Sequence, residues 1–199
     1  MKILILYVPR SGTNSIVDYF LKQHPNYEYF NQPFTRYKET GIKKTKYEEC
    51  IKYENVLVKS DINNFSLLKI NKEKIINDFD KVLLISRKNK REQAISSIIA
   101  QNNKNFLDKT KRKYHLDGIS EEMIKEWEDM FTYCENVLFE LKDPLFRFFY
   151  YEDLFYGDFS ELFDYLNINY IDEDFKNILD KSNKYNIGYH PSKTNKTIL

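Results

Sequence analysis

The stretch ILILYVPRSGTNSIVDYF, residues 3–20, decides the fold class. Its first six residues, 3–8, are all apolar or aromatic, which is typical of a strand buried on both faces of a sheet. A turn of mostly small residues with one arginine follows at 9–15, and apolar residues then recur at helical spacing until Pro25. A strand, a tight turn and a helix in direct succession predict the first unit of a layered α/β fold.

The same alternation continues along the chain. Strands are predicted at 55–61, 81–87 and 145–151, with a short strand or extended loop at 27–34. Helices are predicted at 70–79, 90–103, 120–141, from 158 or 160 to about 166, and at 172–184. Strands that alternate with helices indicate βαβ units, and therefore a three-layer α/β sandwich with a central, mainly parallel sheet. Since no repeat or Gly/Pro/Ser-rich linker divides the sequence, we expect a single domain over residues 1–199.

Composition excludes several function classes. The 199 residues carry a net charge of +1, which disfavours a nucleic-acid-binding or polybasic membrane protein. Cys50 and Cys134 lie far apart without a CxxC partner, so we expect buried thiols in a reducing compartment rather than a disulfide framework or a zinc site. No apolar run is long enough to span a bilayer, and the first one is too short for a signal peptide. A soluble, cytoplasmic protein without a metal site is expected.

The turn after the first strand has the residue types of an anion site. Ligands of parallel sheets bind beyond the carboxyl ends of the strands, where a small-residue turn exposes backbone N–H groups and the next helix adds its positive end. Ser11, Gly12, Thr13 and Asn14 are therefore expected to wrap a phosphate-like group, and Arg10 supplies a full positive charge.

This turn differs from the loop that binds ATP in P-loop enzymes, whose pattern is G-x-x-x-x-G-K-S/T. Tyr7 stands at the place of the first glycine, Thr13 replaces the lysine, and Asn14 replaces the magnesium-binding hydroxyl. The third buried strand ends in Arg87 rather than in an acidic residue. The cradle thus lacks the groups that handle Mg²⁺ and a γ-phosphate. An ordinary strand-to-helix turn is the alternative.

A second anion-binding element is predicted in LLISRKNKREQAISSIIA, residues 83–100. A buried strand ends in Arg87, and the helix that follows carries Ser96, so a guanidinium and a hydroxyl are available for a second phosphate. Ser97 is the alternative to Ser96. Because consecutive helical residues differ by about 100° in direction, only one of the two hydroxyls can face the ligand.

Together these motifs resemble those of the sulfotransferases that use 3′-phosphoadenosine-5′-phosphosulfate (PAPS). The resemblance rests on Pro9–Thr13, on Arg87 with Ser96, and on FFYYEDL at 148–154, and the spacing of the second motif is most similar to the bacterial carbohydrate branch that includes trehalose 2-sulfotransferase. It implies a P-loop-NTPase-like sulfotransferase fold, PAPS as donor, PAP as product and no metal. It further implies an acceptor that is a small molecule or glycan, with a carbohydrate or glycolipid-type hydroxyl.

The resemblance also implies roles for individual residues. Those that would cradle the 5′-phosphosulfate are Pro9, Arg10, Ser11, Gly12, Thr13 and Asn14. Arg87 and Ser96 would bind the 3′-phosphate. Arg10 would also stabilise charge in the reaction, Lys59 would lie near the transferring group, and Glu28 would be the general base.

Several of these assignments have alternatives. Asp61, His24 and His115 are other candidates for the base. Gln32 stands in Gln-Pro-Phe where many relatives have Glu-Pro-Phe, and a glutamine cannot act as a base. For the adenine and the rest of the 3′-phosphate, Lys193 and Lys196 are candidates. The alternative functions are a P-loop-like nucleotide kinase and a non-catalytic nucleotide-binding relative.

Overall fold

Five parallel strands form the sheet at the centre of the computed structural model, which describes residues 1–34, 45–102, 118–169, 171 and 173–178. The strands are β1 (Lys2–Tyr7), β2 (Glu28–Asn31), β3 (Val56–Asp61), β4 (Lys81–Ser86) and β5 (Phe146–Tyr150). They lie in the order β2-β3-β1-β4-β5, and each neighbouring pair is parallel. The predicted α/β fold with a mainly parallel sheet is confirmed.

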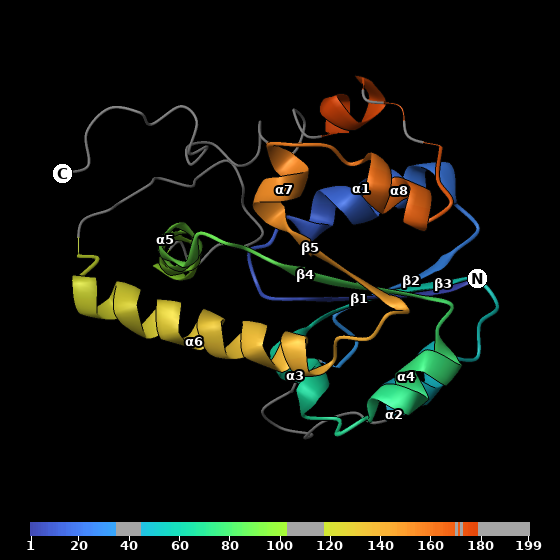
Figure 1. The fold of residues 1–199 in the computed structure, drawn as a ribbon, viewed down its shortest axis with the longest axis horizontal. Helices are drawn as coiled ribbons and strands as arrows, with labels where there is room; N and C mark the ends of the chain where they lie inside the picture. The colour runs from blue at the N-terminus through green and yellow to red at the C-terminus, as the bar shows by residue number, and fades with distance from the viewer. Residues whose placement is uncertain (35–44, 103–117, 170, 172, 179–199) are drawn as a thin grey trace.

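Helices cover both faces of this sheet (Figure 1). On one face lie α1 (Thr13–Gln23), α7 (Tyr151–Phe155) and α8 (Ser160–Tyr165). On the other lie α2 (Thr45–Cys50), α3 (Ile62–Ser66), α4 (Lys72–Asp78) and α6 (Glu121–Glu140). Helix α5 (Lys90–Asn102) packs against α6 at the carboxyl end of the strands. The sequence did not predict α3 or α7, which begin directly where β3 and β5 end.

Alternation along the strands divides the core into two clusters. Ile3, Ile5 and Leu57 face α1 and α8, whereas Leu4 and Leu6 face α6. Successive side chains of a strand point to opposite faces of the sheet, so the same pattern extends to the strand ends. Tyr7 and Lys59 therefore project toward the face that α1 covers.

The strand order identifies where this sheet can bind a ligand. β1 lies between β3 and β4; the chain leaves β1 toward β2 and β3, whereas it leaves β4 toward β5. The connections that follow β1 and β4 thus diverge at neighbouring carboxyl ends. Such a switch point is where open α/β sheets bind ligands, and it brings the turn at 9–12 close to Arg87.

Helix α6 packs one apolar stripe against the core cluster that contains Leu4 and Leu6. Ile124, Phe131, Cys134 and Leu138 are buried along its 20 residues, while Tyr133 is 65% exposed. Cys134 and Cys50 are both buried, as the sequence predicted. Within the described part of the chain, no helix combines the length and the hydrophobicity needed to cross a bilayer.

Phe131→Ala should lower the free energy of unfolding by about 3–5 kcal/mol, because it leaves a cavity beneath the sheet. Phe131 is fully buried and its ring packs 5.4 Å from that of Trp127. Tyr133→Ala on the same helix is the control, and it should change stability by less than about 0.5 kcal/mol. Urea unfolding measures both; equal losses in the two variants would contradict this description of α6.

Candidate functional site

The turn between β1 and α1 is held in a bent conformation by its own residues. Arg10 and Gly12 both have positive φ angles, 69° and 72°, in a region of backbone conformation that residues other than glycine rarely adopt. The buried Ser11 hydroxyl donates a hydrogen bond to the carbonyl of Val8. A Cβ on Gly12 would lie 2.7 Å from the Phe155 ring and 2.8 Å from the Tyr151 ring, so only glycine fits against α7.

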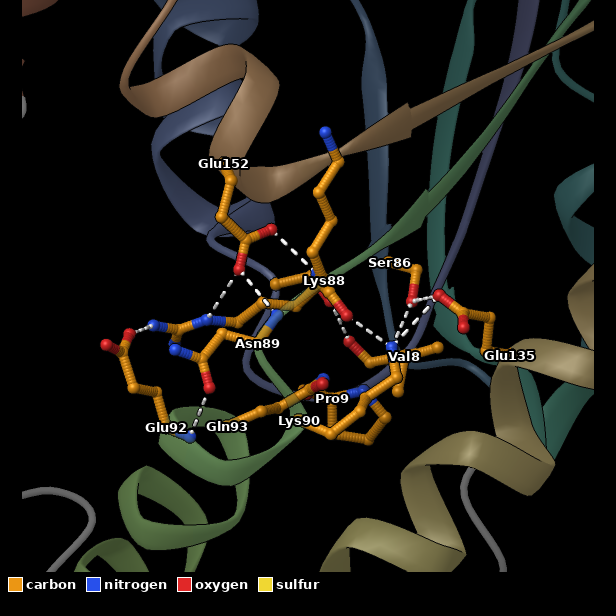
Figure 2. Close-up of polar contacts among 12 residues, drawn as sticks. Val8, Pro9, Ser86, Lys88, Asn89, Lys90, Glu92, Gln93, Glu135 and Glu152 are labelled. Carbon is orange, nitrogen blue, oxygen red and sulfur yellow. Dashed lines mark hydrogen bonds and ion pairs between the residues drawn. The ribbon is translucent and has the colours of Figure 1, made fainter.

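This turn contacts α5 directly, so the two predicted motifs meet. Nε of Arg10 donates to Oγ of Ser96 at 3.1 Å. The buried side chain of Gln93 donates from Nε2 to the carbonyl of Pro9 at 2.5 Å (Figure 2). Ser96 therefore faces the turn, whereas Ser97 is buried. This is the orientation that the sequence analysis favoured, although the role of Ser96 stays a prediction.

Arg87 lies just beyond β4 and is almost completely buried. Its side chain is 7% exposed, and its guanidinium nitrogen Nη2 lies 2.6 Å from Oε2 of Glu92. Nε of Arg87 lies 3.5 Å from Oε1 of Glu152 and has no partner at hydrogen-bond geometry among the described residues. The guanidinium stacks over the Tyr151 ring, 4.6 Å from its centre.

The two arginines occupy one face of α5. Arg87 contacts Glu92 and Arg10 contacts Ser96, and these partners are four residues apart. Residues at this spacing lie on the same side of a helix, roughly 6 Å apart. Tyr151 links the two elements a second time, because its ring touches both the Arg87 guanidinium and the position of Gly12. The structure thus brings Arg10, Gly12, Arg87 and Ser96 together.

The first three residues of α7 bind the loop between β4 and α5. Glu152 accepts hydrogen bonds from the backbone N–H of Lys88 at 2.7 Å and of Asn89 at 3.0 Å (Figure 2). Asp153 pairs with the Lys88 ammonium, and Tyr151 stacks on Arg87. We call Tyr151, Glu152 and Asp153 the α7 clamp. These contacts fix the loop that carries Arg87 to the start of α7.

A second network fixes the same loop from the α6 side. Oε1 of Glu135 accepts from the Ser86 hydroxyl at 2.7 Å and from the Lys90 ammonium at 2.9 Å (Figure 2). Lys90 also donates to the carbonyl of Arg87. Ser86 is fully buried, and the Lys90 and Glu135 side chains are 16% and 14% exposed. The backbone of Arg87 is therefore held on both sides of the sheet.

Lys59 is a buried cation near the start of α1. Its ammonium donates to Oδ1 of Asn14 and lies 5.4 Å from the centre of the Tyr7 ring. Burial lowers the pKa of Lys59 from 10.5 to about 8, against a smaller opposing effect of the Asp18 carboxylate. A charge held in this way has lost much of its hydration without gaining a close anion.

Gln32 lies beside this lysine at the carboxyl end of β2. Its Nε2 donates to the Tyr7 hydroxyl at 2.6 Å, and its backbone N–H donates to the carbonyl of Lys59 at 2.7 Å. Desolvation raises the pKa of the Tyr7 hydroxyl well above its usual range, and the Asp61 carboxylate adds to this shift. Gln32 therefore lies at the carboxyl edge of the sheet, and it is the residue that stands where many proteins of the resembling family have a glutamate.

The candidates for a general base are spread over both ends of the sheet. Glu28 pairs with Val56 at the amino end of β3, whereas Lys59 pairs with Asn31, three residues or roughly 10 Å farther along the strand. This placement argues against Glu28 as the base. His24 ends α1 at the same remote end, as its position after Gln23 requires.

Asp61 does lie at the carboxyl end of the sheet, but its carboxylate caps α3. Oδ1 accepts from the backbone N–H of Asn64 at 2.9 Å, and Oδ2 accepts from the Asn64 side chain. His115, Lys193 and Lys196 lie outside the described residues. Among the residues described, no group of three potential metal ligands lies together.

The comparisons with known proteins concern the arrangement of these elements. No protein-family model matches the sequence, and no curated protein matches it. Among solved structures, mouse sulfotransferase SULT7A1 complexed with PAP aligns with a TM-score of 0.51 at 13% identity, covering 98% of this chain and 67% of that chain. The chain has a sulfotransferase-like fold. A sulfotransferase from Alicyclobacillus acidocaldarius aligns with a TM-score of 0.48 at 14% identity, covering 91% of this chain and 90% of that one.

Gly12→Ala should destabilise the protein more than Gly118→Ala. Both glycines have positive φ, so both variants carry a conformational cost of about 1–2 kcal/mol. Only at Gly12 would the new methyl group collide with rings, which adds about 1–3 kcal/mol; at Gly118 no described atom lies within 4 Å of it. Urea unfolding of both variants measures the difference, and equal losses would mean that α7 does not pack on the turn.

Lys59 should make stability depend on pH in the alkaline range. The folded chain releases its proton near pH 8, whereas the unfolded chain holds it up to about 10.5, so the unfolding free energy should rise with pH between these values. Lys59→Met should lose this rise, and Lys52→Met, at an exposed lysine, is the control. Unfolding measured at pH 7, 8, 9 and 10 tests it; a constant difference between wild type and Lys59→Met would refute the burial of this charge.

Proposed function

We propose that this chain is a PAPS-dependent sulfotransferase that moves a sulfuryl group to a hydroxyl of a carbohydrate or glycolipid-type acceptor. The observation that carries the proposal is the placement of Arg10 and Arg87. The two guanidiniums follow neighbouring parallel strands and contact one face of α5, one helical turn apart. A donor with phosphate groups at both ends of an adenosine needs two such cationic positions.

The residues present fit this donor at both ends. The turn at 9–14 offers the Arg10 guanidinium and the backbone N–H groups at the start of α1. Within the described part of the chain, the buried Nε of Arg87 makes no hydrogen bond, which leaves it able to donate to a ligand oxygen. The likeness of fold to SULT7A1, which was solved with PAP, supports the same reading.

Sulfuryl transfer requires stabilisation of the negative charge that grows on the bridging and sulfuryl oxygens. Arg10 lies in the turn after β1, and the Lys59 ammonium contacts the start of α1 through Asn14. Because the Lys59 ammonium is desolvated and paired with a neutral amide, a nearby anion would stabilise it strongly. We therefore assign Lys59 to charge stabilisation, and donor binding should raise its pKa back toward the ordinary value.

The acceptor assignment rests on the resemblance of the second motif to the bacterial carbohydrate branch. Two rings of β2 are partly exposed: Tyr29 packs on the side of the sheet that α1 covers, and Phe30 packs on the opposite side. Aromatic side chains of this kind provide stacking surfaces for sugar rings.

PAP should raise the melting temperature of the protein, whereas ATP with Mg²⁺ should not. Arg87→Ala should reduce the response to PAP to the weak response expected for adenosine 5′-phosphate, because the variant loses only the group assigned to the 3′-phosphate. Arg147→Ala is the control, since this arginine is exposed and lies elsewhere on the sheet. Stabilisation by ATP with Mg²⁺ but not by PAP would favour the nucleotide-kinase alternative instead.

Transfer of labelled sulfate from PAPS to a panel of glycans and glycolipids tests the reaction itself. Wild type should label at least one acceptor, and Arg10→Ala and Arg87→Ala should each reduce the rate by about 100-fold or more. PAP binding without transfer to any hydroxyl acceptor would favour the non-catalytic alternative.

A further inference from the structure

Arg87 faces more negative charge than it can neutralise. Glu92 approaches one end of its guanidinium at 2.6 Å, and Glu152 lies 3.5 Å from Nε at the other end. One buried cation thus stands between two carboxylates, and the group as a whole is negative. A phosphate dianion cannot join this group without strong repulsion unless one carboxylate leaves.

The two carboxylates are held very differently. Glu152 accepts two backbone hydrogen bonds from the loop that carries Arg87, in addition to its approach to Nε. For Glu92, the described contact is the single ion pair with Arg87, and its side chain is the more exposed of the two, 23% against 17%. Figure 2 shows them reaching the loop from opposite sides, Glu152 from α7 and Glu92 from α5. Glu92 is therefore the carboxylate that can move away.

Glu92 also lies where a second phosphate would have to bind. It is in the first turn of α5, four residues before Ser96, on the face that contacts both arginines. Its carboxylate bonds to the NH2 group of Arg87, a donor well suited to a phosphate oxygen. The Glu92 carboxylate is an anionic group of the chain itself, and in this structure it occupies the position that the phosphate of a ligand would take.

We propose that Glu92 is an internal anion that holds Arg87 in the ligand-free protein and competes for it with the 3′-phosphate of the ligand. This inference rests on the proposed function, because it names what controls the second anion position of that site. A nucleotide with a single 5′-phosphate has no second phosphate to bind Arg87, so the ion pair between Glu92 and Arg87 remains intact. The 3′-phosphate of a bisphosphorylated adenosine displaces the Glu92 carboxylate from Arg87, and the carboxylate turns outward to solvent.

Calorimetric titration of Glu92→Gln with PAP and with adenosine 5′-phosphate tests the proposal. The variant should bind PAP about tenfold more tightly than wild type, because the competing charge is gone. Its affinity for adenosine 5′-phosphate should change by less than about twofold, within the range of a surface charge change. Glu92→Ala should behave in the same way and covers the case of a glutamine that re-forms the contact.

Two further variants separate this effect from general changes in charge and fold. Glu121→Gln removes an exposed glutamate that also pairs with an arginine, Arg91 at 2.7 Å, and should leave both affinities unchanged. Glu152→Gln should weaken PAP binding, because it loosens the loop that carries Arg87. If Glu152→Gln tightens PAP binding instead, the choice of Glu92 as the exchangeable carboxylate is wrong.

The remaining outcomes distinguish this inference from the proposed function. Unchanged or weaker PAP binding in folded Glu92 variants, with wild type binding PAP, overturns the role of Glu92 and leaves the proposed function standing. An equal gain for both nucleotides also overturns it, because the effect would not depend on the 3′-phosphate. If neither wild type nor the variants bind PAP, the proposed function fails and this inference fails with it.

Discussion

A guanidinium that is taken out of water has to be matched by negative charge, and Arg87 places this requirement at the centre of the molecule. Removing an ion of this kind from solvent costs several kcal/mol unless anions and hydrogen bonds replace the water. Glu92 from α5 and Glu152 from α7 provide the anions, and Tyr151 covers the guanidinium. The loop after β4, the start of α5 and the start of α7 are therefore fixed by one charge.

The parts of the fold that follow from local sequence could be predicted. Continuous apolar runs gave the buried strands, and the turn at 9–15 identified the first strand-to-helix connection. Arg10 and Arg87 stand directly after two such strands, so their place at the carboxyl edge needed only the parallel sheet. Ser96 was preferred to Ser97 on the family resemblance, and in the structure it is Ser96 that meets Arg10.

The parts that depend on distant contacts could not be predicted. Glu152 binds the loop at Lys88 across 64 residues of sequence, and Gln93 reaches Pro9 across 84. Helix α7 begins at Tyr151, a residue whose aromatic character continues the strand pattern, so the change from strand to helix had no local signal. The position of Glu28 along the sheet could not be predicted for a related reason: the sequence of a short strand such as β2 does not reveal its register with β3.

The shared face of α5 has a consequence for how strongly a ligand is held. Each cationic position alone would bind a simple anion weakly, since it competes with water and with carboxylates of the chain. Because Arg10 and Arg87 both contact α5, a molecule with two anionic ends would gain the second contact at an effective concentration far above that of free anions. The separation of Arg10 and Arg87, which is fixed by their contacts with Ser96 and Glu92, would then favour ligands whose charges have a matching separation.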